Sequence, residues 1–169
     1  EELTKGSWLA LWYDEPGFFY DGLFVEFDRE HTYQVVRDGF YYNIGKIIVG
    51  FFPAFARSFT TFLKGEFNIT DAADNSTCGE PRRNVVDLEF TSNRIRRGWI
   101  SSNESLIELA DAFAEGTVNT GIRIPGPIGF RANLWNVYVD EDIRVAAGDN
   151  SDGSVGLFVL VRQDFVTPP

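Results

Sequence analysis

The sequence predicts a single all-β domain, an antiparallel barrel or sandwich with one short α-helix. Three observations support this prediction: eight or nine short strand-like segments follow one another at fairly regular spacing, turn-rich stretches separate them, and only one segment has helical periodicity. We favour the barrel, because barrels of this size combine a late helix with an interior wide enough for one ligand. At 169 residues the chain suits one domain spanning 1–169.

Strand-like segments open the chain. Residues 6–13 are apolar and aromatic on both faces, which is typical of a strand buried on both sides. A turn signal at 15–17 precedes two further strands at 22–28 and 31–38. We expect Asp28-Arg29-Glu30 to join these two strands as a hairpin.

Segment 40–62 is apolar but carries Lys46, Pro53 and Arg57. These interruptions exclude a transmembrane helix, which needs roughly 20 predominantly apolar residues. Four aromatic residues recur there at near-helical spacing: Phe51, Phe55, Phe59 and Phe62. We nevertheless favour a strand, a bend at the proline and a second strand at 57–70.

The second half begins with a polar loop at 71–81, followed by strands predicted at 82–90 and 93–100 with a turn near Thr91-Ser92. A helix is expected at 103–115, with Ser102 or Asn103 as its cap and Gly116 at its end. Its apolar stripe consists of Leu106, Ile107, Leu109, Ala110 and Phe113. Three more strand-like segments, at 134–139, 142–147 and 156–162, complete the chain.

Composition limits the function classes. Aromatic residues make up 15% of the chain, with 16 Phe, 6 Tyr and 4 Trp, which is more ring surface than a core of this size needs. Part of it is available to line a cavity or meet an apolar partner. The net charge of −10 argues against nucleic acid, because phosphate backbones are bound by clusters of Lys and Arg.

Catalysis and metal binding are not expected. His31 is the only histidine and Cys78 the only cysteine, so His and Cys clusters for a metal are excluded. We place His31 beside a surface turn, where it does not act as a catalytic base. No signal or transit peptide is recognisable, so we expect the sequence to represent a mature or a trimmed chain.

The opening strand contains Gly6-Ser7-Trp8, which resembles the Gly-x-Trp of the first lipocalin strand. In lipocalins this Trp closes one end of the barrel and an Arg from a late strand packs over it. The resemblance implies that Arg162, at the end of the last predicted strand, lies over the indole of Trp8.

The closing segment, 135–162, contains a second pattern, which consists, in order, of Tyr138, Asp140, Asp142, Arg144, Gly148, Asp149 and Phe158-Val159-Leu160. At these positions the segment resembles the signature of the plastid-lipid-associated, or fibrillin, family. Asn136-Val137 and Ala146-Ala147 depart from the family's Thr-Thr and Ser-Arg. The resemblance implies a divergent family member located in the chloroplast, on thylakoids or plastoglobules.

The charged residues of this segment have two interpretations. Asp140 and Asp142 flank a turn, Arg144 on the next strand can pair with either of them, and Gly148-Asp149 is expected to form the next hairpin. The favoured interpretation is a corner that stabilises the fold. The alternative is a clamp for the head group of a ligand.

The predicted function is non-catalytic binding of an apolar molecule or lipid, such as a carotenoid, chlorophyll, a quinone or another isoprenoid or acyl lipid. The aromatic residues expected to line the barrel are Trp8, Trp12, Phe24, Tyr33, Phe62, Trp135 and Phe158. The alternative is a structural or assembly subunit, in which Phe51, Phe52 and Phe55 contact a thylakoid membrane surface or a membrane pigment–protein complex. A lipid hydrolase or isomerase dependent on Asp140 or Asp142 is a third hypothesis.

Overall fold

The computed structural model of the protein describes residues 2–13, 25–50, 57–70, 85–100, 104–117, 121–125, 128–149 and 154–166. The helical elements in these ranges are the 3-10 helix η1 (Glu2–Thr4) and the α-helix α1 (Leu106–Glu115). The strands are β1 (Gly6–Tyr13), β2 (Val25–Arg37), β3 (Phe40–Val49), β4 (Arg57–Thr70), β5 (Val85–Arg97), β6 (Ile122–Arg123), β7 (Arg131–Val139), β8 (Ile143–Asp149) and β9 (Val155–Arg162).

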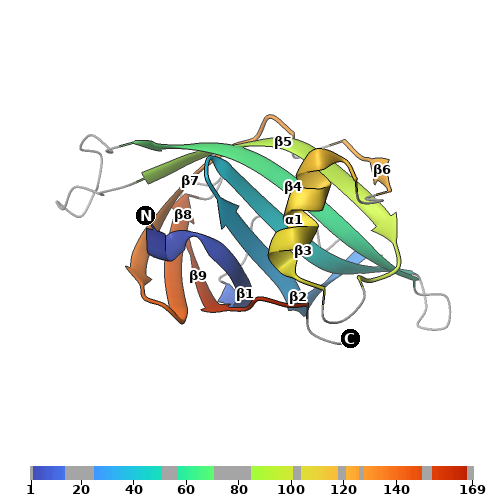
Figure 1. Ribbon diagram of the computed structural model, residues 1–169, viewed down its shortest axis with the longest axis horizontal. Coiled ribbons are helices and arrows are strands. Elements are labelled where there is room, and N and C mark those ends of the chain that lie inside the picture. Colours follow the sequence, from blue (N-terminus) through green and yellow to red (C-terminus); the bar gives the residue numbers. More distant parts are fainter. Residues whose placement is uncertain are drawn as a thin grey trace.

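Eight of the described strands close into one antiparallel barrel (Figure 1). Pairing follows the order β1–β2–β3–β4–β5–β7–β8–β9, and β9 returns to pair with β1. The short β6 pairs only with the end of β5, and α1 lies with it in the connection from β5 to β7. The barrel predicted from the sequence is therefore confirmed, and a sandwich is excluded.

The interior of the barrel is filled from alternate positions of its strands, because successive side chains of a strand point to opposite faces. One cluster of buried residues occupies this interior: Trp8, Ala10, Val36, Tyr41, Leu88, Phe90, Leu134, Ala146 and Leu160. Phe158 packs against the same cluster. Every barrel strand thus adds at least one apolar or aromatic side chain, with Tyr41 from β3 and the partly buried Leu63 and Phe67 from β4.

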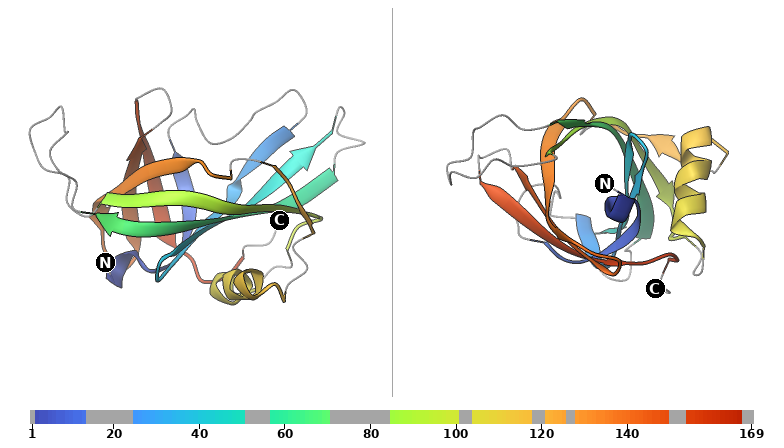
Figure 2. Two further views of the ribbon diagram at one scale, coloured as in Figure 1. Left: turned by 90° about the horizontal axis from the view of Figure 1, so that it is seen from above. Right: turned by 60° about the vertical axis from the view of Figure 1, so that its left-hand side comes forward.

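A second cluster lies on the outside of the barrel, beneath α1. The helix contributes Leu106, Leu109, Ala110 and Phe113. The strands contribute Tyr33 and Val35 from β2, Tyr42 and Ile44 from β3, and Phe62 from β4. Figure 2 (right) looks along the barrel and shows α1 against the outside of the ring, with η1 across one end of it. The two faces of β2 and β3 are therefore both buried.

The predicted helix is confirmed, with a different cap. Ser105 is the N-cap residue, since its Oγ accepts a hydrogen bond from the backbone N–H of Glu108. Gly116 ends the helix in the left-handed conformation, as expected from its position. Within the described ranges, no helix is long and apolar enough to cross a membrane.

Two predicted hairpins are wrong, because β2 and β5 each run through the expected turn. In β2, pairing with β3 is kept on both sides of 29–31, and these residues form an irregularity in one long strand. In β5, Phe90 and Ser92 pair with consecutive residues of β4, so Thr91 is the extra residue of a bulge. Polar residues that favour a turn locally are accommodated here because the neighbouring strand continues past them.

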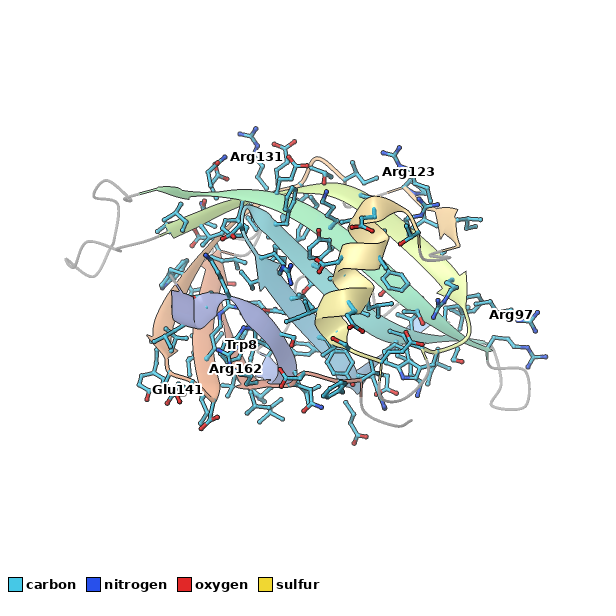
Figure 3. The ribbon with its side chains drawn as sticks, viewed as in Figure 1. Trp8, Arg97, Arg123, Arg131, Glu141 and Arg162 are labelled. Atoms are coloured by element: carbon cyan, nitrogen blue, oxygen red, sulfur yellow. The ribbon has the colours of Figure 1, made fainter. Side chains whose placement is uncertain are left out.

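The first and last strands of the barrel are joined by Trp8 and Arg162, which pair across β1 and β9. The Arg162 guanidinium carbon lies 4.2 Å from the centroid of the Trp8 ring, and Figure 3 shows the two residues side by side below η1. Arg162 Nη1 and Nη2 donate to the backbone carbonyls of Lys5 and Leu3 at 3.1 and 3.0 Å. The contact expected from the lipocalin resemblance is confirmed.

Gly6 makes this contact possible. Its φ of 120° is a conformation that residues with a Cβ rarely adopt, and a Cβ there would overlap Arg162 Nη1. The Gly-x-Trp spacing therefore leaves room for the arginine that covers the tryptophan.

Replacing Gly6 by alanine should lower the free energy of unfolding by at least about 2 kcal/mol, because it adds a steric overlap to an unfavourable φ. Gly39→Ala is the matched control, since Gly39 also has a positive φ of 72° but nothing lies within 4 Å of a Cβ there. This control should cost about 1 kcal/mol. Urea denaturation of both variants measures the difference, and equal losses would contradict the role given to Gly6.

Candidate functional site

A cavity of about 280 Å³ lies inside the barrel at the end where η1 is found. Its wall contains apolar side chains from four strands, among them Val36, Phe67, Val86, Leu134 and Val139. Thr4 and Lys5 border it on the side of η1. A much smaller space of about 40 Å³ lies further along the interior, and Tyr41 and Leu134 line both spaces. The larger cavity is the candidate site.

Arg144 is the charged residue of the cavity wall that is buried inside the barrel, with 3% of its surface exposed. It faces inward because it alternates along β8 with Ile143 and Val145, in phase with Ala146 of the interior cluster. Its Nε donates to Asn136 Oδ1 at 2.8 Å, and its Nη1 donates to Gln34 Oε1 at 3.3 Å. Both partners are neutral amides.

Tyr41 lies in the same cavity wall and is 4% exposed. Burial raises the pKa of its phenol far above the ordinary value, against the smaller opposing effects of the Arg144 charge and a hydrogen bond from Asn43. Tyr41 therefore keeps its proton at neutral pH. Burial lowers the pKa of Arg144, but an arginine begins from such a high value that it remains charged.

The mouth of the cavity carries an ion pair between Lys5 Nζ and Asp38 Oδ1, 2.6 Å apart. The hydrogen bond and the charge of Lys5 hold the pKa of Asp38 below its usual range. Asp38 is well exposed, so the pair contributes little to stability. Because its charges cancel, the pair leaves Arg144 as the unbalanced charge among the cavity residues.

The predicted lining residues fall in different places. Trp8 and Phe158 belong to the interior cluster, and Trp135 borders the cavity. Tyr33 and Phe62 are completely buried, but they pack beneath α1 outside the barrel, which corrects their predicted position. The cause is register: the odd positions of β2 and the even positions of β4 that carry them face outward there.

Trp12 is half exposed, with 50% of its surface accessible. A register shift between Ala10 and Trp12 in the pairing of β1 with β9 interrupts the alternation that would place it inside. This also corrects the prediction that it lines the interior. Phe24 and the predicted contact residues Phe51, Phe52 and Phe55 lie outside the described residues.

The closing motif builds a corner, as the favoured interpretation states. Asp140 Oδ1 accepts hydrogen bonds from the backbone N–H groups of Asp142 and Ile143, and Asp140 Oδ2 accepts one from the Tyr138 hydroxyl at 2.7 Å. The predicted pairing of Arg144 with Asp140 or Asp142 is wrong, because Arg144 points into the barrel while the turn is outside it. The Asp142 carbonyl instead accepts from the backbone N–H of Arg162.

Gly148 and Asp149 are the last residues of β8, where they pair with Gly156 and Val155 of β9, and 150–153 lie outside the described residues. A Cβ on Gly148 would lie 2.6 Å from Leu134 Cδ2, so the glycine is needed for close packing in the interior. The Asp149 carboxylate accepts a hydrogen bond from Asn133 on β7. Both residues of this part of the motif therefore have structural roles.

His31 is buried on the outer face of β2, not exposed at a turn as predicted. Its Nδ1 lies 3.0 Å from Asp28 Oδ1, and Lys46 Nζ lies 3.0 Å from Asp28 Oδ2. Burial raises the pKa of Asp28, but hydrogen bonds from His31 and Lys46 outweigh it and leave that pKa lowered. The Trp99 ring covers the group edge-on at 5.3 Å from the imidazole. This arrangement holds Trp99, shortly after the end of β5, against the barrel.

The sequence did not reveal Tyr41 and Asn136 as cavity residues, or Gln34, which lines the smaller space, as a partner of Arg144. The face on which each of them lies depends on a strand register that the chain alone does not specify. Among the described residues, no group of three His, Cys, Asp or Glu side chains is arranged to hold a metal ion.

No protein-family model, curated protein or solved structure matches this chain. The site is accordingly described from the chain's own residues.

The corner at Asp140 predicts a pH-dependent loss of stability. The Tyr138 hydroxyl and the two backbone N–H groups lower the pKa of Asp140 in the folded state. A group with a lowered folded pKa stabilises the protein above its unfolded pKa of roughly 4 and loses this effect as the pH falls through the folded value. Asp140→Ala should therefore be less stable than the wild type at pH 7, with a smaller difference at pH 2.5.

Denaturation curves at the two pH values measure this difference. Glu141→Ala is the control, because it removes a neighbouring exposed carboxylate from the same turn. A difference for Asp140→Ala that does not change with pH would show that the carboxylate charge has no part in holding the corner.

Proposed function

We propose that the protein is a non-catalytic binding protein that holds one single-chain apolar molecule, of the isoprenoid or acyl-lipid class, in the cavity beside η1. The observation that carries this proposal is the cavity itself, about 280 Å³ in volume, inside a closed barrel that also encloses a cluster of buried side chains. Well-packed domains rarely retain a void of this size without a ligand.

The size and chemistry of the wall indicate the ligand class. Ligand sites typically have volumes of roughly 300–1,000 Å³, so this cavity is at the small end of the range. The cavity suits a ligand with one hydrocarbon tail better than a chlorophyll or a lipid with two tails. Val36, Phe67, Val86 and Leu134 supply apolar surface, and each Å² removed from water contributes roughly 25 cal/mol to binding.

We extend the proposal to a plastid setting, in the chloroplast on thylakoids or plastoglobules. Its support is the resemblance of 135–162 to the fibrillin signature. The confirmed contact between Trp8 and Arg162 supports the lipocalin-like part of that resemblance.

The outer face of β8 and β9 favours a second function, docking on a membrane or a membrane protein complex. Ile143 pairs with Val161 and Val145 with Val159, and these side chains and that of Leu157 alternate with interior positions. Ile143, Leu157 and the neighbouring Val155 are each about 40% exposed. An exposed apolar sheet face of this kind is typical of an interaction surface.

Filling the cavity tests the first function. Val86→Phe should weaken binding of all-trans-retinol, a neutral isoprenoid probe, by about tenfold or more, because the added ring takes space that the ligand needs. Val155→Phe is the matched control on the outer face of β9 and should leave the affinity unchanged. Titration followed by protein tryptophan fluorescence measures both, and undiminished binding by Val86→Phe would place the ligand elsewhere.

A charge on the outer face tests the second function. Leu157→Glu should abolish co-sedimentation of the protein with isolated thylakoid membranes, because docking would bury a carboxylate in an apolar contact. It should leave retinol binding intact, since Leu157 is outside the barrel. Co-sedimentation that survives the substitution would remove the outer face of β8 and β9 as the docking surface.

A further inference from the structure

Arg144 is a cation buried inside the barrel, and its hydrogen-bond partners carry no charge. A buried cation is costly unless an anion compensates it, and no carboxylate of the described residues forms an ion pair with Arg144. Asp38 at the mouth is paired with Lys5, and Asp140 is used by the corner outside the barrel. The guanidinium therefore lies in an apolar cavity wall with only neutral partners.

The neutral partners hold Arg144 in place without using up its donors. A guanidinium has five N–H groups, and the hydrogen bonds to Asn136 and Gln34 use two of them. Asn136 is itself fixed, because its amide nitrogen donates to Thr4 Oγ1 at 2.7 Å and its oxygen therefore faces Arg144. Three N–H groups of an oriented guanidinium are thus left for a further acceptor.

Tyr41 supplies a second donor in the same wall. Its phenol keeps its proton at neutral pH because burial raises its pKa. The hydroxyl can therefore donate to an oxygen in the cavity. Arg144 and Tyr41 together offer a cation and a neutral donor at the polar side of a cavity that is otherwise apolar.

We infer that the cavity binds a single-tailed amphiphile by its carboxylate, with Arg144 and Tyr41 holding the carboxylate and the apolar wall holding the tail. This inference rests on the proposed function and specifies the polar end of its ligand. A carboxylate matches the fork of a guanidinium in geometry. Its single negative charge also balances the single positive charge of Arg144, whereas a phosphate monoester carries nearly two at neutral pH.

A pair of probes with the same tail tests this inference on the wild-type protein. All-trans-retinoic acid and all-trans-retinol differ only in the group at one end. Retinoic acid should bind about tenfold more tightly or better, because a charge-assisted hydrogen bond replaces a neutral one. Equal affinities would overturn the inference and leave the proposed function standing, whereas no binding of either probe would contradict both.

Two variants test whether Arg144 and Tyr41 hold the carboxylate. Arg144→Met keeps the length of the apolar stem and removes the charge. It should weaken the binding of retinoic acid by about tenfold or more and change the affinity for retinol by less than about threefold. Tyr41→Phe should produce a smaller loss for the acid alone. Arg131→Met is the matched control, since Arg131 is exposed on β7 and paired with Glu89.

Near-ultraviolet circular dichroism establishes that each variant is folded. If Arg144→Met does not fold, Tyr41→Phe and the comparison of the two probes on the wild type still decide the question. If Arg144→Met lowers the affinities for retinol and retinoic acid to the same extent, the inference is overturned, because the substitution would then act on the cavity as a whole.

Discussion

The barrel depends on the contact between Arg162 and Trp8, which joins the last strand to the first. A closed barrel requires its two terminal strands to meet, and here the meeting point is a guanidinium stacked on an indole and anchored to the carbonyls before β1. Trp8 Nε1 also donates to the Thr4 carbonyl, which fixes η1 across this end of the barrel. The same contact thus closes the sheet and positions one boundary of the cavity.

Closure has a consequence for the interior. With α1 packed on the outside of β2, β3 and β4, the large aromatic side chains beneath it stabilise the wall and do not occupy the interior. The interior holds its own cluster around Trp8, Leu88, Phe90 and Leu160, and a cavity remains beside η1. Arg144 and Asn136 in its wall form a hydrogen-bonded group with Gln34, linked through Thr4 to η1.

Much of the fold could be predicted from the sequence, because local patterns determine it. The α1 stripe, the end of the helix at Gly116 and the Gly-x-Trp of β1 each follow from a short stretch of chain. The hairpins expected near Glu30 and Thr91 were wrong, since pairing with the neighbouring strand overrides a local turn preference. Tyr33 and Phe62 could not be assigned to a face, because a shift of one residue in register exchanges inside and outside.

The candidate site was less predictable for the same reason. Arg144 was recognised within a motif, but its partners proved to be Gln34 and Asn136, 110 and 8 positions away in sequence. Only the folded barrel brings these residues to one wall.

A crystal structure of the protein with all-trans-retinoic acid would locate the ligand. We expect electron density for one ligand in the cavity between η1 and Tyr41, with its carboxylate within hydrogen-bond distance of Arg144. A cavity closed by the protein's own side chains, or a ligand found only on the outer face of the barrel, would contradict this expectation.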